Sequence, residues 1–285
     1  MTQKQWTTVA RVLVTLAVLA VGCTMVLPFV WTLSTSFKRD IDVFSYPIKW
    51  IPPVISTAPY ERVLGGQISA SRATPFMRAY LNSAIVTMPG VLGPLITSLL
   101  AGFAFARLRF PYRNAVFMVF LSTMIIPEQV LLISRFMIAN WLHIYNSYWA
   151  LILPYLTTAY GTFLVRQACL TIPQDLLDAA KMDGAHTLQQ ILHVVVPAIG
   201  PQLAALAMLL FVWRWNDYAM PLIMLTRPEM FTVPVALSTF IEDHANINYA
   251  ALMAATVLST APLLVVFVLA NRFFVRSIVS SGVKG

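Results

Sequence analysis

The chain has 285 residues, of which 59% are hydrophobic and 11% are charged, and its mean hydropathy is +0.75. Soluble domains carry about 25% charged residues, so this composition excludes an ordinary soluble enzyme and indicates a protein of the lipid bilayer. The net charge of +8 does not indicate a nucleic-acid partner. Nucleic-acid binding would require a continuous basic stripe. Here Lys and Arg instead gather at the ends of apolar segments.

Six segments are long and apolar enough to cross a bilayer, which takes roughly 20 residues for about 30 Å of hydrocarbon. Lipid offers no hydrogen-bond partner to the backbone, so each segment should be helical. We therefore expect an all-α membrane protein with one transmembrane domain over residues 1–285. The predicted spans are residues 12–35, 83–106, 115–138, 147–168, 199–225 and 251–274.

Basic residues at the span ends predict the orientation of the chain. Cytoplasmic loops of membrane proteins carry an excess of Lys and Arg, and placing both termini in the cytoplasm satisfies this rule. The long segment of residues 37–80 then lies outside, where its turn-forming prolines and glycines predict an irregular cap. The basic residues on the predicted inner side are Lys4, Arg11, Arg107, Arg109, Arg113, Arg272, Arg276 and Lys284.

Prolines occur within or near the predicted spans. Each removes a backbone hydrogen bond and can kink its helix, and kinked helices can enclose a cavity. Membrane helices also tolerate proline without any special role. Only the set as a whole indicates a pathway: positions 28, 89, 94, 127, 154, 221 and 262.

Residues 171–198 form a polar loop between the fourth and fifth spans. Thr171-Ile-Pro-Gln174 predicts a capping box, so a helix should begin near Ile172. Gly184 should end that helix as its C-terminal cap. A second amphipathic stretch, with apolar residues at helical spacing, then runs to Pro197 and Pro201. The loop is therefore expected to be a helix, a turn and a helix at the cytoplasmic surface.

Four charged residues fall inside the third and fifth predicted spans: Glu128, Arg135, Arg214 and Asp217. Charges at membrane depth are costly unless they face protein, water or each other, and Arg214 and Asp217 are close enough along one helix to pair. Neighbouring side chains could offer ring faces and an amide to a sugar, although packing against another subunit explains them equally well. The candidate pathway residues are Trp213, Arg214, Trp215, Asn216, Asp217 and Glu128.

The polar loop resembles that of the inner-membrane permease subunits of bacterial ABC importers. These carry Glu-Ala-Ala, three residues and Gly before a second helix that ends in proline. Here the loop has Asp178-Ala-Ala180, then Gly184 and Pro197. Asp in place of Glu keeps the charge but shortens its reach.

Further motifs resemble the carbohydrate branch of that family, in particular the shorter permease similar to the second maltose-type subunit. The resemblance covers nearly the whole chain and implies a type I importer fold with six transmembrane helices and a cytoplasmic helix-turn-helix coupling loop. The motifs are Pro28-Phe-Val-Trp-Thr-Leu-Ser-Thr-Ser-Phe-Lys38, Asn82-Ser83, Ala104-Phe-Ala-Arg-Leu-Arg-Phe-Pro111, Asn146-Ser-Tyr-Trp-Ala-Leu-Ile-Leu-Pro154, Trp215-Asn-Asp217, Asn271-Arg-Phe-Phe-Val-Arg276 and Gly282-Val-Lys-Gly285.

The resemblance implies a sugar or sugar-like substrate and a location in the bacterial inner membrane. It also implies a second permease, two ATP-binding subunits that hold ATP and Mg, and an extracytoplasmic solute-binding protein. The chain itself carries no Gly-rich phosphate loop, so we expect no cofactor here. The residues expected to contact the ATPase are Asp178, Ala179, Ala180, Asp183, Gly184 and Ala185 in the coupling loop, and Gly282, Val283, Lys284 and Gly285 in the tail.

Two other classes of protein stay open at this point. An ion-coupled carrier or channel subunit would also place charges inside the membrane, but it would leave the coupling loop without a purpose. An intramembrane enzyme would need a nucleophile and a base at a recognisable spacing, and neither a metal-binding motif nor Gly-x-Ser-x-Gly occurs. The sequence therefore predicts a transporter subunit without catalytic residues, and it does not name the sugar, polyol or glycerol-phosphate derivative carried.

Overall fold

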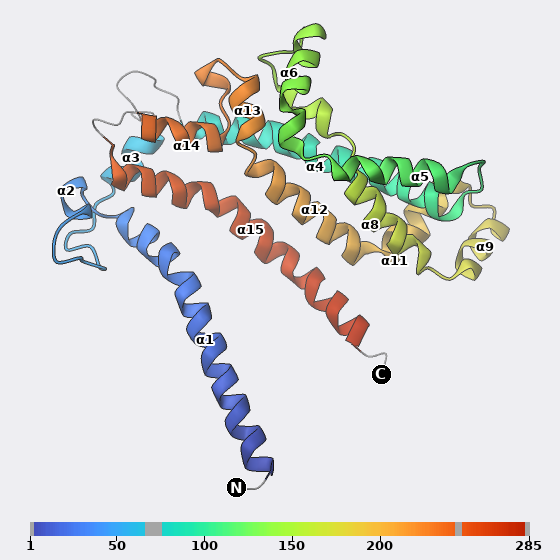
Figure 1. Cartoon of the computed structure of the whole chain (residues 1–285), viewed down its shortest axis with the longest axis horizontal. Coiled ribbons are helices and arrows are strands. Elements are labelled where there is room, and N and C mark those ends of the chain that lie inside the picture. The colour runs from blue at the N-terminus through green and yellow to red at the C-terminus, as the bar shows by residue number, and fades with distance from the viewer. Residues whose placement is uncertain (1–2, 66–75, 243–246, 283–285) are drawn as a thin grey trace. The chain divides into compact units, whose positions relative to one another are not determined.

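The computed structural model describes residues 3–65, 76–242 and 247–282, which form helices joined by turns (Figure 1). Contacts within the chain group it into two compact units. The first unit holds residues 1–76 and 237–260, and the second holds residues 77–236 and 261–285. Each unit is described separately below.

The first unit begins with the long helix α1 (Gln3–Thr35). Its apolar segment Arg11–Thr35 carries large side chains that are exposed along its length, such as Leu16 and Phe29. Pro28 lies inside the helix and does not end it. An apolar helix that buries so little of itself in its own chain needs lipid or another subunit to cover it. The first predicted span is thus a continuous helix.

The predicted irregular segment of residues 37–80 contains two short helices, α2 (Asp40–Val43) and α3 (Ala58–Leu64). At its start, the Lys38 ammonium is fully buried and lies 3.9 Å from the centroid of the Trp31 ring. Burial lowers the pKa of Lys38 below its usual range, and the nearby Asp42 carboxylate opposes this shift. Residues 66–75 lie outside the described part of the chain.

The segment differs from the prediction at its end, because α4 (Phe76–Arg107) begins at residue 76 and not at 83. Arg78 lowers the local hydropathy and so hides the first turns of this helix from a search for apolar residues. Asn82 and Ser83, expected at the start of the span, lie well inside the helix and are buried. The Asn82 side-chain amide donates to the carbonyls of Glu229 and Phe231, each at 2.9 Å. Tertiary contacts of this kind extend a helix beyond its apolar stretch.

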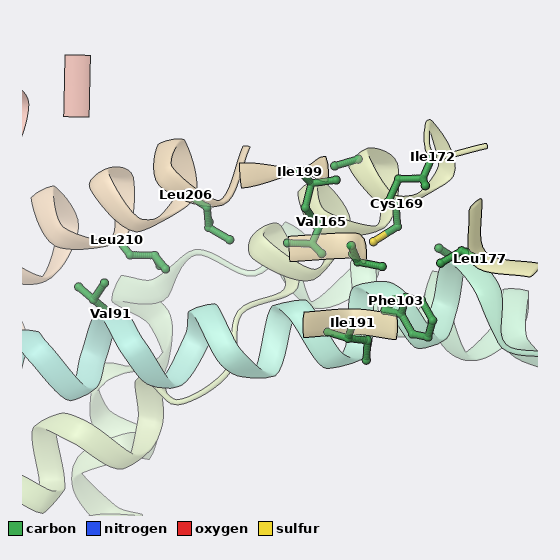
Figure 2. Close-up of a cluster of buried hydrophobic side chains, with 13 residues drawn as sticks. Val91, Phe103, Val165, Cys169, Ile172, Leu177, Ile191, Ile199, Leu206 and Leu210 are labelled. Atoms are coloured by element: carbon green, nitrogen blue, oxygen red, sulfur yellow. The ribbon is translucent and has the colours of Figure 1, made fainter. Parts of the chain in front are cut away.

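The core of the second unit lies between α4, α8 (Ala159–Leu170) and α12 (Gly200–Trp215). Figure 2 shows that side chains from the coupling loop belong to the same cluster, with Leu177 and Ile191 near Phe103 of α4. Leu177 and Ile191 are each 4% exposed. The predicted coupling loop, residues 171–198, is therefore anchored in the apolar core of this unit.

The closest approach within this core occurs where α4 meets α8. A Cβ atom added at Gly102 would lie 2.7 Å from Val165 Cγ1 and 2.9 Å from the backbone nitrogen of Arg166. A Cβ at Gly93 would lie 2.7 Å from Leu156 Cδ2. Small residues at helix interfaces let membrane helices approach this closely. Both glycines are needed for the contact of α4 with residues 156–166.

The chain bends sharply within the predicted span 115–138 and again where the polar loop of residues 171–198 meets the span 199–225. The segments Arg113–Ile125 and Glu128–Trp141 meet at 89°, with Pro127 at the break, and Thr187–Ala198 meets Gly200–Trp215 at 85°. Figure 1 shows the first bend between α5 (Arg113–Ser122) and α6 (Leu132–Trp141). Pro127 fits the prediction of proline kinks, because it removes a backbone donor at the point of the bend.

The described residues contain three helices that could span a membrane, or five if each bent pair forms one span. The three are Arg11–Thr35, Phe76–Arg107 and Tyr249–Ala270, the last within α15 (Tyr249–Gly282). The remaining predicted span, residues 147–168, is divided among short helices that are each too short to cross alone. They are α7 (Tyr148–Ile152), the 3-10 turn Leu153–Tyr155 and α8.

We predict that Gly102→Ala destabilises the protein by about 1–3 kcal/mol, because the new methyl group overlaps Val165 and a backbone atom. Thermal unfolding of the detergent-solubilised chain should show a lower midpoint. Gly22→Ala is the matched control, since nothing lies within 4 Å of a Cβ at Gly22. Equal midpoints for the two variants would contradict the close approach.

Candidate coupling surface and translocation cavity

The first helix of the coupling loop is α9 (Gln174–Met182), and Gly184 ends it as predicted. The Gly184 φ angle is +81°, in the left-handed region that favours glycine. The amide of Gly184 donates to the Lys181 carbonyl at 3.0 Å, and the amide of Ala185 donates to the Ala180 carbonyl at 2.9 Å. This pair of bonds is a Schellman motif, which satisfies the last carbonyls of the helix and fixes the direction of the chain after it.

The predicted capping box at Thr171 is wrong. The Thr171 hydroxyl donates to the Ala168 carbonyl at 2.8 Å, and α9 begins at Gln174, after Pro173. A capping box occurs instead at the second helix, α10 (Thr187–Gln190). There the Gln189 amide donates to His186 Nδ1 at 3.4 Å and the His186 amide donates to Gln189 Oε1 at 3.0 Å. His186 therefore opens α10, a role that its sequence context did not indicate.

The second half of the loop is helical but irregular. After α10 the chain forms a π-helical turn, Ile191–Val195, and the short α11 (Val196–Ala198). The π-helical turn alters the spacing of side chains in this stretch. Of the four apolar residues predicted for one face, Ile191 and Val195 are buried, while Leu188 and Leu192 stay about half exposed. The chain then turns at Gly200 into α12, within the predicted stretch that ends at Pro201.

The loop presents a surface of small and acidic side chains. Of the six residues predicted to contact an ATPase, Asp178, Ala179, Asp183 and Gly184 are exposed, and Ala180 and Ala185 are partly buried. On the opposite side of α9, Leu177 is held in the core. The exposed part of the loop thus combines the small residues Ala179 and Gly184, which allow close approach, with the larger exposed side chains of Leu176 and Met182.

A cavity of about 360 Å³ lies within the second unit. Its size falls in the range of sites for small molecules. Three of the predicted pathway residues, Trp213, Arg214 and Glu128, line it. The full lining is Gly90, Pro94, Thr123, Met124, Ile126, Glu128, Leu131, Arg135, Pro154, Tyr155, Thr157, Thr158, Ala159, Tyr160, Leu210, Trp213 and Arg214.

Arg214 is held from three sides. Its guanidinium pairs with Asp217 at 3.5 Å, as the sequence predicts, and its Cζ atom lies 3.4 Å from the centroid of the Tyr155 ring. Both partners of the ion pair are mostly buried. Gly90 makes room for the side chain, because a Cβ atom there would lie 3.1 Å from Arg214 Cγ. A charge pair and an aromatic face together offset much of the cost of placing this cation away from water.

Arg135 also contacts Tyr155. Its Cζ atom is 5.1 Å from the ring centroid, and it donates to the Tyr155 hydroxyl at 3.3 Å. Within the described ranges, Arg135 makes no ion pair. Glu128 is exposed in the same cavity wall. The cavity therefore carries two guanidinium groups, only one of which has a carboxylate partner.

The other three predicted pathway residues lie elsewhere. Trp215 is buried and stacks on Phe211, with ring centroids 5.6 Å apart. The Asn216 side chain donates to the Val212 carbonyl at 2.8 Å. Asp217 lines a narrower adjoining cavity and accepts from the Met220 amide at 3.3 Å. The structure thus separates residues that are consecutive in the sequence.

Sequence analysis missed two aromatic residues of the cavity, Tyr155 and Tyr160. The Tyr160 ring meets the ring of Trp213 edge-on, with centroids 5.6 Å apart. Tyr155 follows Pro154 at the end of a recognised motif, which was the one local signal of a special position. Their spacing alone does not distinguish cavity residues from core residues. The predicted tail residues Val283, Lys284 and Gly285 lie outside the described part, and Gly282 ends α15.

Comparisons with known proteins agree on the kind of molecule. Residues 95–280 match the sequence model of a family described as the binding-protein-dependent transport system inner membrane component. The arabinooligosaccharides transport system permease protein AraQ of Halalkalibacterium halodurans is 33% identical over 204 residues, which cover 72% of this chain and 73% of that protein. The sn-glycerol-3-phosphate transport system permease protein UgpE of Yersinia pseudotuberculosis is 31% identical over 243 residues, which cover 85% of this chain and 86% of that protein.

A solved structure has the same fold. A chain in the crystal structure of a bacterial ABC transporter involved in the import of the acidic polysaccharide alginate superposes with a TM-score of 0.82 at 22% identity. The match covers 96% of this chain and 99% of that chain. Another chain, from an alginate transporter in complex with an alginate pentasaccharide-bound periplasmic protein, gives a TM-score of 0.63 at 15% identity.

Proposed function

Because this chain belongs to the family of binding-protein-dependent transport system inner membrane components, we propose that it forms half of the translocation pathway of an ABC importer for a sugar or sugar-like solute. The observation that carries the proposal is the family match, which includes the whole coupling loop. The relatives named above transport arabinooligosaccharides and sn-glycerol 3-phosphate. Because the chain belongs to this family, we prefer the importer to the two alternatives, an ion-coupled carrier and an intramembrane enzyme.

The working importer then contains a second permease, two ATP-binding subunits and an extracytoplasmic solute-binding protein. ATP and Mg belong to the ATP-binding subunits. The chain crosses the inner membrane six times as one permease domain, with both termini in the cytoplasm. The exposed apolar side of α1 supports this assembly, since lipid and a second permease would cover it.

The coupling loop is the contact with the ATPase. Ala179 and Gly184 permit close approach, and Asp183 offers a carboxylate at the same surface. Closure of the ATPase dimer would displace this rigid element and rotate the spans between inward and outward states. The burial of Leu177 and Ile191 supports the proposal, because a loop held in the core transmits a displacement to the helices around it.

The cavity at Tyr155 and Arg214 belongs to the substrate pathway. Its aromatic rings suit the faces of a sugar, and its two guanidinium groups suit an acidic group such as a phosphate or carboxylate. Arg135 supports the second statement, because it has no carboxylate partner in the described part of the chain. Two of the related systems carry anionic substrates, sn-glycerol 3-phosphate and alginate.

The assembly is tested by purification from mild detergent. A second permease and an ATPase should co-purify with the tagged chain, and neither should co-purify with an unrelated tagged inner-membrane protein. Recovery of the chain alone would count against the proposed function.

We predict that Gly184→Asp abolishes substrate uptake and substrate-stimulated ATPase activity while the protein stays in the membrane. The substitution adds bulk and a negative charge at the contact with the ATPase. Gly184→Asn is the matched control: it adds the same bulk without charge and tolerates the left-handed backbone. It should therefore keep more activity. Normal stimulation in the Asp variant would contradict the coupling assignment.

We predict that Arg214→Ala lowers uptake of the native substrate at least about tenfold, the loss expected when a charged hydrogen bond is removed. This variant leaves the Asp217 carboxylate unpaired, so the double variant Arg214→Ala/Asp217→Asn is the control for stability. Both variants should lose uptake, while the double variant should unfold at a higher temperature than the single one. Unchanged uptake in both would remove Arg214 from the pathway.

A further inference from the structure

The last residue of α4, Arg107, reaches across to the start of the coupling loop. One terminal nitrogen of its guanidinium donates to Gln174 Oε1 at 2.8 Å. The other donates to the carbonyl of Cys169 at 2.6 Å and to the carbonyl of Ile172. A single side chain of α4 thus bonds to the end of α8, to the linker and to the first residue of α9.

The two carbonyls lie outside the regular helical hydrogen-bond pattern. Cys169 is in the last turn of α8, where carbonyls lack the amide donors of the regular helix, and its carbonyl also accepts from the Ile172 amide at 3.3 Å. Ile172 lies in the linker between α8 and α9, directly before Pro173. A basic side chain is well suited to such positions. Arg107 therefore closes α8 and fixes the linker from which α9 starts.

Gln174 extends the connection into the coupling helix. Its Nε2 atom donates to Asp178 Oδ1 at 3.1 Å, while its Oε1 atom accepts from Arg107. The charges determine the direction of the amide, because the carbonyl faces a cation and the amino group faces a carboxylate. Arg107, Gln174 and Asp178 form a continuous relay from α4 to the coupling motif.

Near its middle α4 lines the cavity, with Gly90 and Pro94. Gly90 is seventeen residues before Arg107, or about 26 Å along the helix axis. Gly90 contacts Arg214, and a shift of α4 would change the space available to that side chain. A single helix therefore connects the relay with the cavity.

We propose that Arg107 is a positioning residue that couples the displacement of α9 to α4 through Gln174 and Asp178. The proposal rests on the proposed function, which makes α9 the contact with the ATPase. It assigns to Asp178 a bond within the chain, and it leaves Ala179, Asp183 and Gly184 to the partner. A movement of α9 then pulls on α4 through the relay, and α4 carries it to Gly90 and Arg214.

The proposal is tested in the complete importer, reconstituted in liposomes with its own binding protein and native substrate. The measured quantity is the amount of substrate transported per ATP hydrolysed. Gln174→Leu removes the relay but keeps both bonds from Arg107 to the backbone carbonyls. Arg107→Lys keeps the charge but loses the planar fork that serves several acceptors at once.

We expect each variant to lower transport per ATP at least about threefold, the size of effect seen for residues that modulate coupling. The subunits should still co-purify in the normal ratio. Exposed neighbours provide the controls, Arg109→Gln after α4 and Asp175→Asn in α9, and these should match the wild type. A normal ratio in both relay variants would overturn the proposal. If Arg107→Lys does not assemble, Gln174→Leu decides alone.

A double variant separates the relay from a direct contact of Asp178 with the ATPase. If the relay is correct, Asp178→Ala adds little to the loss caused by Gln174→Leu. Losses that multiply would contradict it, because Asp178 would then act independently of Gln174. Gly184→Asp distinguishes this proposal from the proposed function. If Gly184→Asp uncouples transport while the relay variants are normal, the relay proposal is wrong but the contact of the loop with the ATPase stands. If Gly184→Asp is also normal, both the relay and the contact with the ATPase are wrong.

Discussion

The close approach of α4 to residues 156–166 is the constraint on which the second unit depends. Without a side chain at Gly102, the backbone of α8 comes near enough to α4 for Val165 and Cys169 to join its core. The same approach brings the Cys169 carbonyl within reach of Arg107. Hydrogen bonds and dispersion contacts hold membrane helices together more than hydrophobic burial does. A contact made by small residues is therefore what positions both the coupling loop and the cavity.

Several features could be predicted from the sequence because they depend on neighbours along the chain. The turn at Gly184 needs only a residue that accepts a positive φ angle, and the Arg214–Asp217 pair needs only two charges three positions apart. The start of α4 and the cap near Thr171 could not be predicted in this way. In both places side chains bond to groups that are distant in the sequence: Asn82 donates to the backbone carbonyls of Glu229 and Phe231, and Gln174 accepts from the Arg107 guanidinium.

The residues of the cavity, too, could be predicted from the sequence only in part. Hydropathy marks Glu128 and Arg214 because charges are conspicuous in an apolar chain, but it gives no reason to select Tyr155 among many aromatic residues. Tyr155 becomes central only in three dimensions, where its ring contacts two guanidinium groups. Conversely, Trp215 looks like a sugar-binding residue beside Arg214, yet it stacks on Phe211. Adjacent residues on a helix point about 100° apart, so Trp215 need not share the cavity that Arg214 lines.

The hydrogen bond between Asp178 and Gln174 gives a physical reason for Asp in place of Glu at residue 178. The permease pattern that the loop resembles has Glu at this position, and a Glu side chain would reach farther from the helix. The shorter Asp178 side chain bonds to Gln174, one turn earlier on the same helix, which is a spacing that favours such pairs. Gln174 is in turn held by Arg107, so the acidic group is directed into its own chain. In the proposed contact, the surface left for a partner then contains the small residues Ala179 and Gly184 together with the exposed side chains of Leu176, Met182 and Asp183.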